Sequence, residues 1–282
     1  MSYRESLSQR AIAISISDSP DMAVLGLEED HLRDAMTEVA RHLLALGARL
    51  AYGGDLRTHG FTELLFELVA RHRRDADIGD ERASVISYLA WPVHLGMPVE
   101  ELKGLFQDMG DIAEVICLTK DGRVMPFDER KRLATRAPTE SEWAQGLTAM
   151  RRVITDASDA RVALGGRMRG FKGRMPGIAE EALSALQAGK PLFLLGGFGG
   201  CTRDIAEHLG IIAPGTRPRP PWRGRRLFVG LDASRLNNGL DAEENATLTR
   251  TVHVDQAVAL LLRGLLRLLA RSDDESSLAG EA

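Results

Sequence analysis

RVALGGRMRGFKGRMPGIAEE at residues 161–181 and GKPLFLLGGFGGCTRDIAEH at residues 189–208 decide the fold of this chain. In both segments a short apolar run ends in a Gly-Gly pair, and a glycine-rich loop leads into a helix. This order of strand, turn and helix is typical of phosphate-binding sites in parallel α/β proteins. A similar segment, RLAYGGDLRTHGFTELLFELV, occupies residues 49–69. We therefore predict that the three segments belong to one largely parallel α/β sheet.

The glycine pairs admit two interpretations. In a parallel sheet the carboxyl ends of the strands lie at one edge, and ligands bind there. Glycine has no Cβ and tolerates positive φ, so a ligand can contact the backbone amides of such turns. Alternatively, each pair makes only a tight turn between strand and helix. Three pairs in the same context favour a nucleotide or phosphosugar site at this edge.

Length and composition fit one large α/β domain. The chain has 282 residues, of which 44% are hydrophobic, and its net charge is -4. This balance excludes a disordered chain and argues against a general attraction to nucleic acid. The two cysteines, Cys117 and Cys201, form no CxxC motif. They indicate a reduced, cytoplasmic protein without a metal site or disulfide framework. The sequence shows neither a signal-peptide pattern nor an apolar run long enough for a membrane span.

We predict a single domain over residues 11–271, with an N-terminal tail at 1–10 and a disordered tail at 272–282. The expected architecture has three layers (α, β, α) with a mostly parallel sheet and a C-terminal helix packed on it. That leucine-rich helix, over residues 255–270, would form a dimer contact if its leucines were exposed. Residues 119–138 are charged and irregular, and we expect an excursion that could act as a lid. Short apolar runs predict further strands at residues 11–16, 50–52, 85–91, 115–118 and 227–230.

Polar and basic residues adjoin the predicted turns. Ser17 and Asp18 follow the first strand, where they could bind a phosphate or ribose or merely form a polar turn before Pro20. Basic residues follow the second and third glycine pairs and would neutralise a diphosphate that backbone amides hold. The candidate ligand-binding residues are Ser17, Asp18, Gly53, Gly54, Asp55, Gly165, Gly166, Arg167, Arg169, Lys172, Arg174, Gly196, Gly197, Phe198, Gly199, Gly200, Cys201, Thr202 and Arg203.

The segment TRPRPPWRGRR at residues 216–226 combines arginine, proline and one tryptophan. It could contact a phosphate or a single nucleic-acid strand, with Trp222 as a stacking surface. Alternatively, it is a solvated connector of polyproline type. The negative net charge of the chain favours the connector.

These segments resemble the SLOG superfamily of Rossmann-like proteins. That superfamily includes Lonely Guy phosphoribohydrolases and a DNA-processing protein that loads single strands. The resemblance covers about residues 11–270, and its nearest branch is the prokaryotic sensors associated with anti-phage defence. It implies a nucleotide ligand derived from NAD, such as ADP-ribose or its cyclic form, and no required cofactor. The residues that carry it are YGGD (52–55), GFTE (60–63), GGR (165–167), GGFGGCTRD (196–204) and LNNGL (236–240).

The enzymatic branch of the superfamily carries Pro-Gly-Gly-x-Gly-Thr-x-x-Glu. In this chain Leu195 replaces the proline, Gly200 replaces the threonine, and Arg203 stands where the catalytic glutamate is expected. Cleavage of an N-glycosidic bond needs a carboxylate near the ribose. The resemblance therefore favours a binding protein whose ligand changes loop order or oligomeric state, either as a homo-oligomer or through a separate effector protein. The alternative is a phosphoribohydrolase or NAD glycohydrolase that uses Asp204 or Glu180; single-stranded DNA binding is a weaker alternative.

Overall fold

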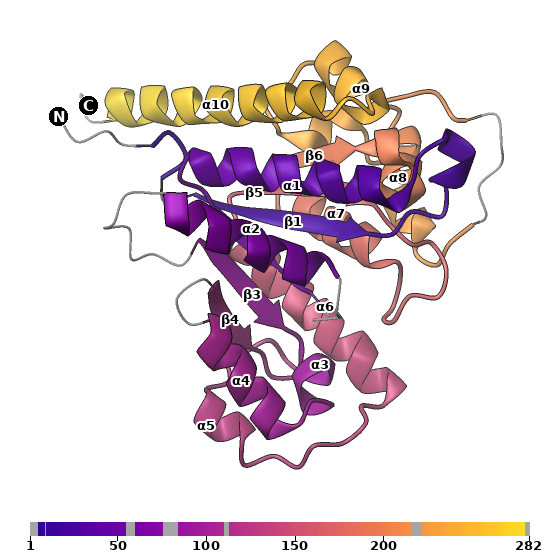
Figure 1. Cartoon of the computed structure of the whole chain (residues 1–282). Coiled ribbons are helices and arrows are strands. Elements are labelled where there is room, and N and C mark those ends of the chain that lie inside the picture. Colours follow the sequence, from indigo (N-terminus) through magenta and orange to yellow (C-terminus); the bar gives the residue numbers. More distant parts are fainter. Residues whose placement is uncertain are drawn as a thin grey trace.

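The strands described in this computed structural model run parallel in one sheet (Figure 1). The structure describes residues 5–8, 10–54, 60–75, 84–109, 113–215 and 221–279. The strands are β1 (Ala11–Ser17), β2 (Arg49–Tyr52), β3 (Val85–Leu89), β4 (Ala113–Cys117), β5 (Ala160–Gly165) and β6 (Leu192–Leu195). Their order across the sheet is β4-β3-β2-β1-β5-β6, so the prediction of a mostly parallel sheet is confirmed.

Helices cover both faces of this sheet, as the three-layer prediction requires. Ile12 and Ile14 of β1 lie in one hydrophobic cluster with the first helices, whereas Ala13 lies in another with Met150 and Ile154. Successive side chains of a strand point to opposite faces, which explains why β1 is almost uniformly apolar. The helices are α1 (Glu29–Ala45), α2 (Phe61–Asp75), α3 (Trp91–Leu95), α4 (Val99–Met109), α5 (Phe127–Arg130), α6 (Glu140–Asp156), α7 (Gly177–Gln187), α8 (Gly200–His208), α9 (Ala242–Arg250) and α10 (Val254–Ala279).

The C-terminal helix α10 lies beside α1 and α9 (Figure 1). Its leucine face is buried in the protein's own core, where Leu261 and Leu265 are almost fully covered. Of the leucines at positions 260–269, whose burial is described, Leu266 is the exposed one, at 42%. The leucine face is therefore accounted for within one chain. No helix in the described part of the chain combines the length and apolar character that a membrane span requires.

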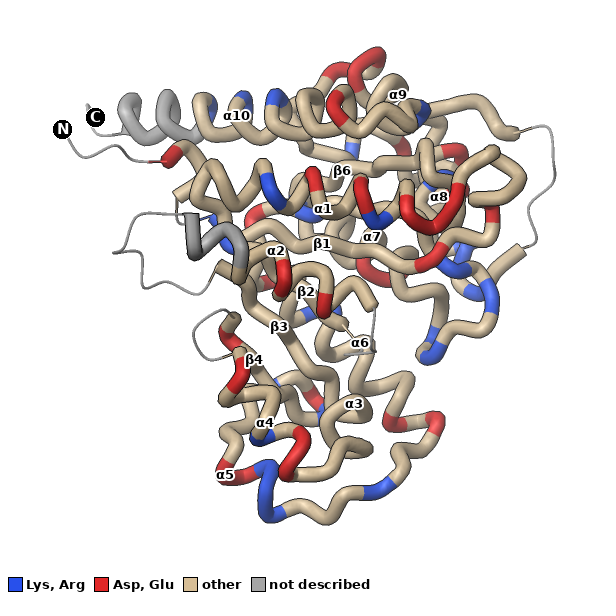
Figure 2. Tube along the Cα trace, in the orientation of Figure 1, with Lys and Arg blue, Asp and Glu red and all other residues tan. Residues whose placement is uncertain are grey.

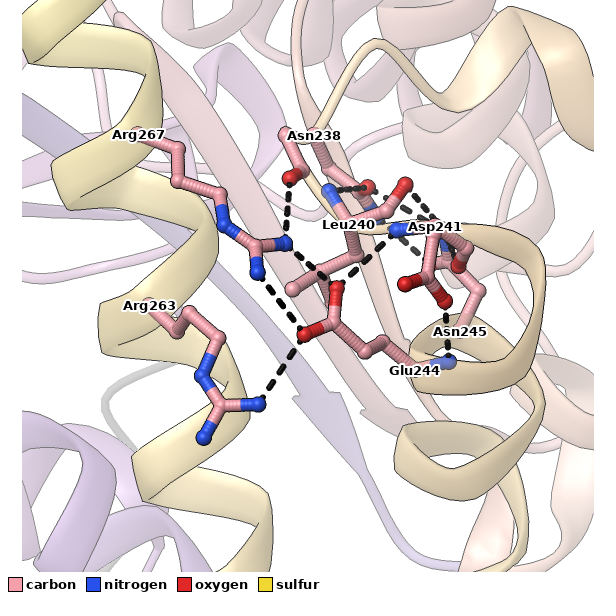
Figure 3. A network of polar contacts seen from close by, with 8 residues as sticks. Asn238, Leu240, Asp241, Glu244, Asn245, Arg263 and Arg267 are labelled. Atoms are coloured by element: carbon pink, nitrogen blue, oxygen red, sulfur yellow. Dashed lines mark hydrogen bonds and ion pairs between the residues drawn. The ribbon is translucent and has the colours of Figure 1, made fainter.

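The LNNGL segment holds α10 and α9 on the sheet. Asn238 donates from Nδ2 to the Leu192 carbonyl oxygen (2.9 Å) and to Oδ1 of Asn245 (2.8 Å). Glu244 pairs with Arg263 and Arg267 of α10 (Figure 3). At Gly264 an added Cβ would lie 2.4 Å from the Asn238 carbonyl oxygen, so the two backbones touch. The conspicuous asparagines of this segment thus have a packing role.

The prediction of a last strand at residues 227–230 is wrong. Residues Arg225–Phe228 form a 3₁₀ turn, and Phe228 is buried against Trp222. The outer edge of β6 is already in use, because the Leu192 and Leu194 carbonyl oxygens accept hydrogen bonds from Asn238 and Thr249. Side chains therefore cover the edge that another strand would need.

The ends of the domain also differ from the prediction. Leu7, in the predicted N-terminal tail, is buried in the main core, and its amide donates to the Leu46 carbonyl oxygen (2.8 Å). At the other end α10 continues to Ala279, where a disordered tail was expected from Ser272. The prediction placed the end of the helix too early because the leucines at helical spacing end before the helix does.

The excursion at residues 119–138 is packed onto the fold and is not a free lid. Met125 is buried with Leu89 and Leu102, and Phe127 packs against Phe106 of α4. Arg130, at the end of α5, is fully buried and donates to the carbonyl oxygens of residues 94–97. Charged residues made this segment look like a surface loop, but one of its arginines serves as an internal hydrogen-bond donor.

A buried histidine next to this segment predicts an acid-dependent loss of stability. The Nε2–H of His94 donates to the Leu118 carbonyl oxygen (2.8 Å), and Nδ1 is buried with no hydrogen-bond partner among the described residues. Burial lowers the pKa of His94 from its ordinary 6.5 to about 4. Between these values the unfolded chain binds the proton and the folded chain does not, so stability is complete above pH 6.5 and falls with pH. We expect a loss of about 3 kcal/mol across this window.

Urea unfolding of the wild type and His94→Gln at several pH values would measure this effect. The difference in unfolding free energy between the two proteins should shrink as the pH falls from 6.5 to 4, since glutamine does not titrate. A difference that stays constant over this range would show that the His94 pKa is not lowered.

Candidate functional site

The order of the strands places a topological switch point between β1 and β5. From β1 the chain proceeds outward through β2, β3 and β4, and it then returns to the other side of β1 as β5. In such sheets the crevice for a ligand opens at the carboxyl ends of the two strands at the switch point. Ser17 and Gly165 are paired in the register at that point. The site therefore has to be sought around the ends of β1 and β5.

The second and third glycine turns meet here. The Cys201 amide donates to the Gly166 carbonyl oxygen (2.9 Å), and the Gly166 amide donates to the Ser17 carbonyl oxygen (2.9 Å). An added Cβ on Gly200 would lie 2.7 Å from the Gly166 carbonyl oxygen. We call Ser17, Gly165, Gly166, Gly199 and Gly200 the rim. The structure brings together this part of the predicted site, at the amino end of α8.

Polar side chains tie the rim together. The backbone amide of Arg167 donates to Ser17 Oγ (3.2 Å), and the Arg167 guanidinium forms an ion pair with Asp18. The amide of Gly200 donates to Oδ2 of Asp21 (2.8 Å). The carboxylates that follow β1 thus face the two groups that were predicted to bind phosphate, a basic side chain and a helix amino end.

The predicted basic residues lie on the loop from β5 to α7. In Figure 2 blue segments gather along this loop at the carboxyl edge of the sheet. Arg169 and Arg174 are exposed, and Lys172 Nζ lies 3.9 Å from the ring centre of Trp143. Met168 and Met175 are buried near its two ends. The loop is therefore anchored by apolar side chains and presents its cations to solvent.

Two glycines of the third turn have a packing role that the sequence did not predict. An added Cβ on Gly197 would lie 1.9 Å from the Thr251 carbonyl oxygen, and one on Gly196 would lie 2.9 Å from that of Thr249. Phe198 next to them is buried. Gly196 and Gly197 are therefore small because the chain at the end of α9 packs on them.

The first glycine turn lies at the same edge but has other neighbours. A Cβ on Gly53 would meet the Met150 side chain of α6 at 2.6 Å, and one on Gly54 would meet Thr62 Oγ1 at 2.1 Å. No contact with the rim is among the nearest neighbours of either glycine. Asp55 lies outside the described residues, so its predicted role stays a prediction.

The remaining candidates lie on α8. Cys201 and Thr202 are fully buried, and within the residues that the structure describes the hydroxyl of Thr202 has no hydrogen-bond partner. Arg203 is largely covered and donates from Nε to Glu207 (3.2 Å). Arg203 therefore supports α8 from its own helix, whereas Thr202 leaves an unsatisfied hydroxyl in the first turn.

Both predicted catalytic carboxylates are engaged in structural contacts. Asp204 is buried and accepts hydrogen bonds from Trp222 Nε1 (2.7 Å) and Arg225 Nε (3.1 Å). Glu180 accepts a hydrogen bond from Thr148 Oγ1 (2.5 Å) and forms an ion pair with the buried Arg151. A glycosidase mechanism would have to release one of these carboxylates from its partners.

The contacts of Asp204 also correct the view of the arginine-rich segment. Trp222 is buried against Phe228, so it cannot serve as an exposed stacking surface. The described part of the segment is not a solvated connector either, because Asp204 anchors it to α8. Residues 216–220 lie outside the described residues.

Sequence reasoning missed Asp21 and a buried ion network. Arg161 of β5 pairs with Glu181, which also pairs with Arg151 of α6 (3.4 Å for each pair). Arg161 Nη1 donates to Ser15 Oγ (2.7 Å). An arginine inside a strand next to apolar residues was the available signal for this network. For the contact of Asp21 with the Gly200 amide no local signal exists, because the two residues are 179 positions apart.

A cavity of about 660 Å³ lies away from the rim. It is lined by Asn237, Asn238, Asp241, Arg267 and Arg271, among others. Asn238 bonds to Leu192 at the start of β6, so this cavity lies near the amino end of that strand. In its wall Asn238 donates to Asn245 Oδ1 (2.8 Å), and Arg267 donates to the Gly239 carbonyl oxygen (3.2 Å) (Figure 3).

Comparison with known proteins gives two findings. The model of one protein family, described as SLOG cluster2, matches residues 6–216. The match covers the sheet, the rim and α8, and it ends before α9 and α10. No curated protein matches the chain.

Proposed function

This chain belongs to the SLOG cluster2 family, whose members have a Rossmann-like fold and functions connected with nucleotides, and we propose that it is a sensor of a NAD-derived nucleotide. ADP-ribose and cyclic ADP-ribose are the ligands that we favour. The observation that carries the proposal is the convergence of the second and third glycine turns at the switch point, beside a basic loop. Parallel α/β sheets bind ligands at this position.

The chemistry of the rim suits a diphosphate. The amino end of α8 favours negative charge, and arginine guanidinium groups form strong, charge-assisted hydrogen bonds with phosphate oxygens. Arg167 lies beside Ser17, whose hydroxyl can bond to either a phosphate or a ribose. Arg169 is exposed on the same loop. These groups would hold the charged centre of the ligand.

The output of the sensor would be a change in loop order or in assembly. The proposal includes a cytoplasmic role in bacterial anti-phage signalling, which the resemblance implies. A second copy of the chain or a separate effector protein would carry the signal onward. Neither a metal ion nor a further cofactor is required.

Replacement of the basic residues at the rim tests this function. Arg167→Gln and Arg169→Gln should each weaken binding of ADP-ribose about tenfold or more, because each removes a charged hydrogen-bond donor. Isothermal titration calorimetry with NAD, ADP-ribose, cyclic ADP-ribose and AMP would measure the affinities. Arg132→Gln, an exposed arginine after α5, is the matched control and should leave the affinity unchanged.

Two results would contradict the proposal. The first is the absence of any heat from the wild type with all four nucleotides at high protein concentration. The second is turnover of NAD or AMP to the free base, detected by chromatography and lost in Asp204→Asn. That second result would favour the glycosidase instead.

A further inference from the structure

Two carboxylates of one short segment occupy the groups at the rim that best suit phosphate. Asp18 forms an ion pair with Arg167, and Asp21 accepts a hydrogen bond from the Gly200 amide (2.8 Å). The two acids are three residues apart, and their partners are the basic side chain after β5 and the first residue of α8. The two carboxylates of this segment thus lie where the negative charges of a bound diphosphate are expected.

The segment, residues 18–27, is here called the strap. It folds mostly on itself: the Leu25 amide donates to the Asp21 carbonyl oxygen (3.0 Å) and the Leu27 amide to that of Met22 (2.9 Å). Met22 is buried in the main core, whereas Val24 is 62% exposed. The Leu25 side chain lies close over Gly199, 2.9 Å from where a Cβ would be. Among the described contacts, Met22 and Leu27 join the strap to the main core, and Asp21 and Leu25 hold it over the rim.

A second feature of the same turn is a buried hydroxyl. Thr202, in the first turn of α8, is fully buried, and its hydroxyl has no hydrogen-bond partner in the described part of the chain. A buried hydroxyl without a partner is costly and calls for an explanation, such as a group that arrives with a ligand. The first turn of α8 thus combines a carboxylate on its first amide with a buried hydroxyl that no described residue satisfies.

We propose that the strap is an internal competitor of the nucleotide, in which Asp18 and Asp21 stand in for the two phosphates. This inference rests on the proposed function, and it adds the regulation of that site. A nucleotide would bind only when both carboxylates leave, and the released strap would be the first moving part of the signal. The apparent affinity is the intrinsic affinity multiplied by the fraction of molecules in which the strap is open.

A graded series at Asp21 tests this proposal. Asp21→Ala removes the carboxylate and should bind the nucleotide about five- to tenfold more tightly than the wild type, a factor that corresponds to the loss of a capping group of ordinary strength. Asp21→Asn keeps a neutral hydrogen-bond acceptor, so its affinity for the nucleotide should lie between those of the wild type and Asp21→Ala. Asp34→Ala, an exposed acid of α1, is the matched control and should bind like the wild type. Calorimetry with ADP-ribose and with inorganic pyrophosphate would give the affinities.

Hydrogen exchange measured by mass spectrometry provides a second readout, which begins with the wild type. Addition of ADP-ribose or pyrophosphate to the wild type should accelerate exchange in the strap and protect the first turn of α8. The Asp21→Ala strap should exchange faster than the wild-type strap even without additions. If Asp21 were instead a permanent cap of α8, the strap would stay protected from exchange when the ligand is added. Asp21→Ala would then bind the ligand more weakly than the wild type.

The possible outcomes separate this inference from the proposed function. If ADP-ribose binds the wild type but Asp21→Ala binds it no more tightly, the strap inference is wrong and the sensor function stands. If no nucleotide binds but pyrophosphate prefers Asp21→Ala, the strap inference stands and the nucleotide proposal falls. If neither nucleotide nor pyrophosphate binds any variant, both are wrong.

Discussion

Replacement of Gly200 by alanine is expected to lower the free energy of unfolding by about 2 to 5 kcal/mol. Gly200 has a φ of +66°, where a side chain is strained. A Cβ there would also lie 2.7 Å from the backbone of Gly165 and Gly166. These neighbours are main-chain atoms of the rim, so no side chain can rotate away. The substitution must push α8 and the end of β5 apart.

Gly210 provides the matched control at the other end of α8. Its φ of +72° is nearly the same, but nothing lies within 4 Å of an added Cβ. Gly210→Ala should therefore show only the backbone cost, about 1 to 2 kcal/mol. Urea unfolding followed by circular dichroism would compare the two variants. Equal losses would mean that the contact between the two glycine turns does not stabilise the fold.

Apolar runs and glycine turns were sufficient to predict the fold. The strands at residues 11–16, 50–52 and 115–118 match β1, β2 and β4 closely, because buried parallel strands are continuous apolar runs. The same pattern failed at residues 227–230. A short apolar run also fits a buried turn, and only the tertiary structure decides whether a free sheet edge is available.

The meeting of two glycine turns could be predicted from the sequence, whereas the neighbours of each glycine could not. Gly165, Gly166, Gly199 and Gly200 do meet at one edge, as parallel strands require. Gly196 and Gly197 obey the same sequence pattern, but residues 249–251 pack on them. A glycine in a turn marks a close approach, and sequence alone does not tell whether a ligand or another backbone approaches. The contacts of Asp204 with Trp222 and Arg225, and of Asp21 with Gly200, were equally hidden, because no local sequence pattern links residues that are 18, 21 or 179 positions apart.

The excursion at residues 119–138 shows that charged residues do not reliably predict an exposed segment, and Arg130 is the clearest example. Its guanidinium is fully buried and donates to the carbonyl oxygens of His94 (2.6 Å from Nη2), Met97 (2.9 Å) and Leu133 (3.2 Å). Burial lowers the pKa of Arg130 from its ordinary value. A charge retained in such surroundings indicates that these carbonyl groups depend on it, because buried acceptors without partners are destabilising.

We therefore expect Arg130→Met to lower the free energy of unfolding by about 2 to 4 kcal/mol. Methionine fills a similar volume but leaves the carbonyl oxygens of residues 94–97 with fewer donors. Arg130→Lys should also be destabilising, since a single ammonium group cannot span the same set of carbonyl oxygens. Urea unfolding would measure the loss, and hydrogen exchange would locate it.

Arg132, two residues further on, is exposed and provides the control. Arg132→Met should change the stability by no more than about 0.5 kcal/mol. In Arg130→Met the loss of protection from exchange should concentrate in residues 91–97 and 118–133, because the guanidinium joins these two segments. If protection there were unchanged, apolar contacts such as those of Met125 and Phe127 would suffice to hold the excursion, and Arg130 would not be its anchor.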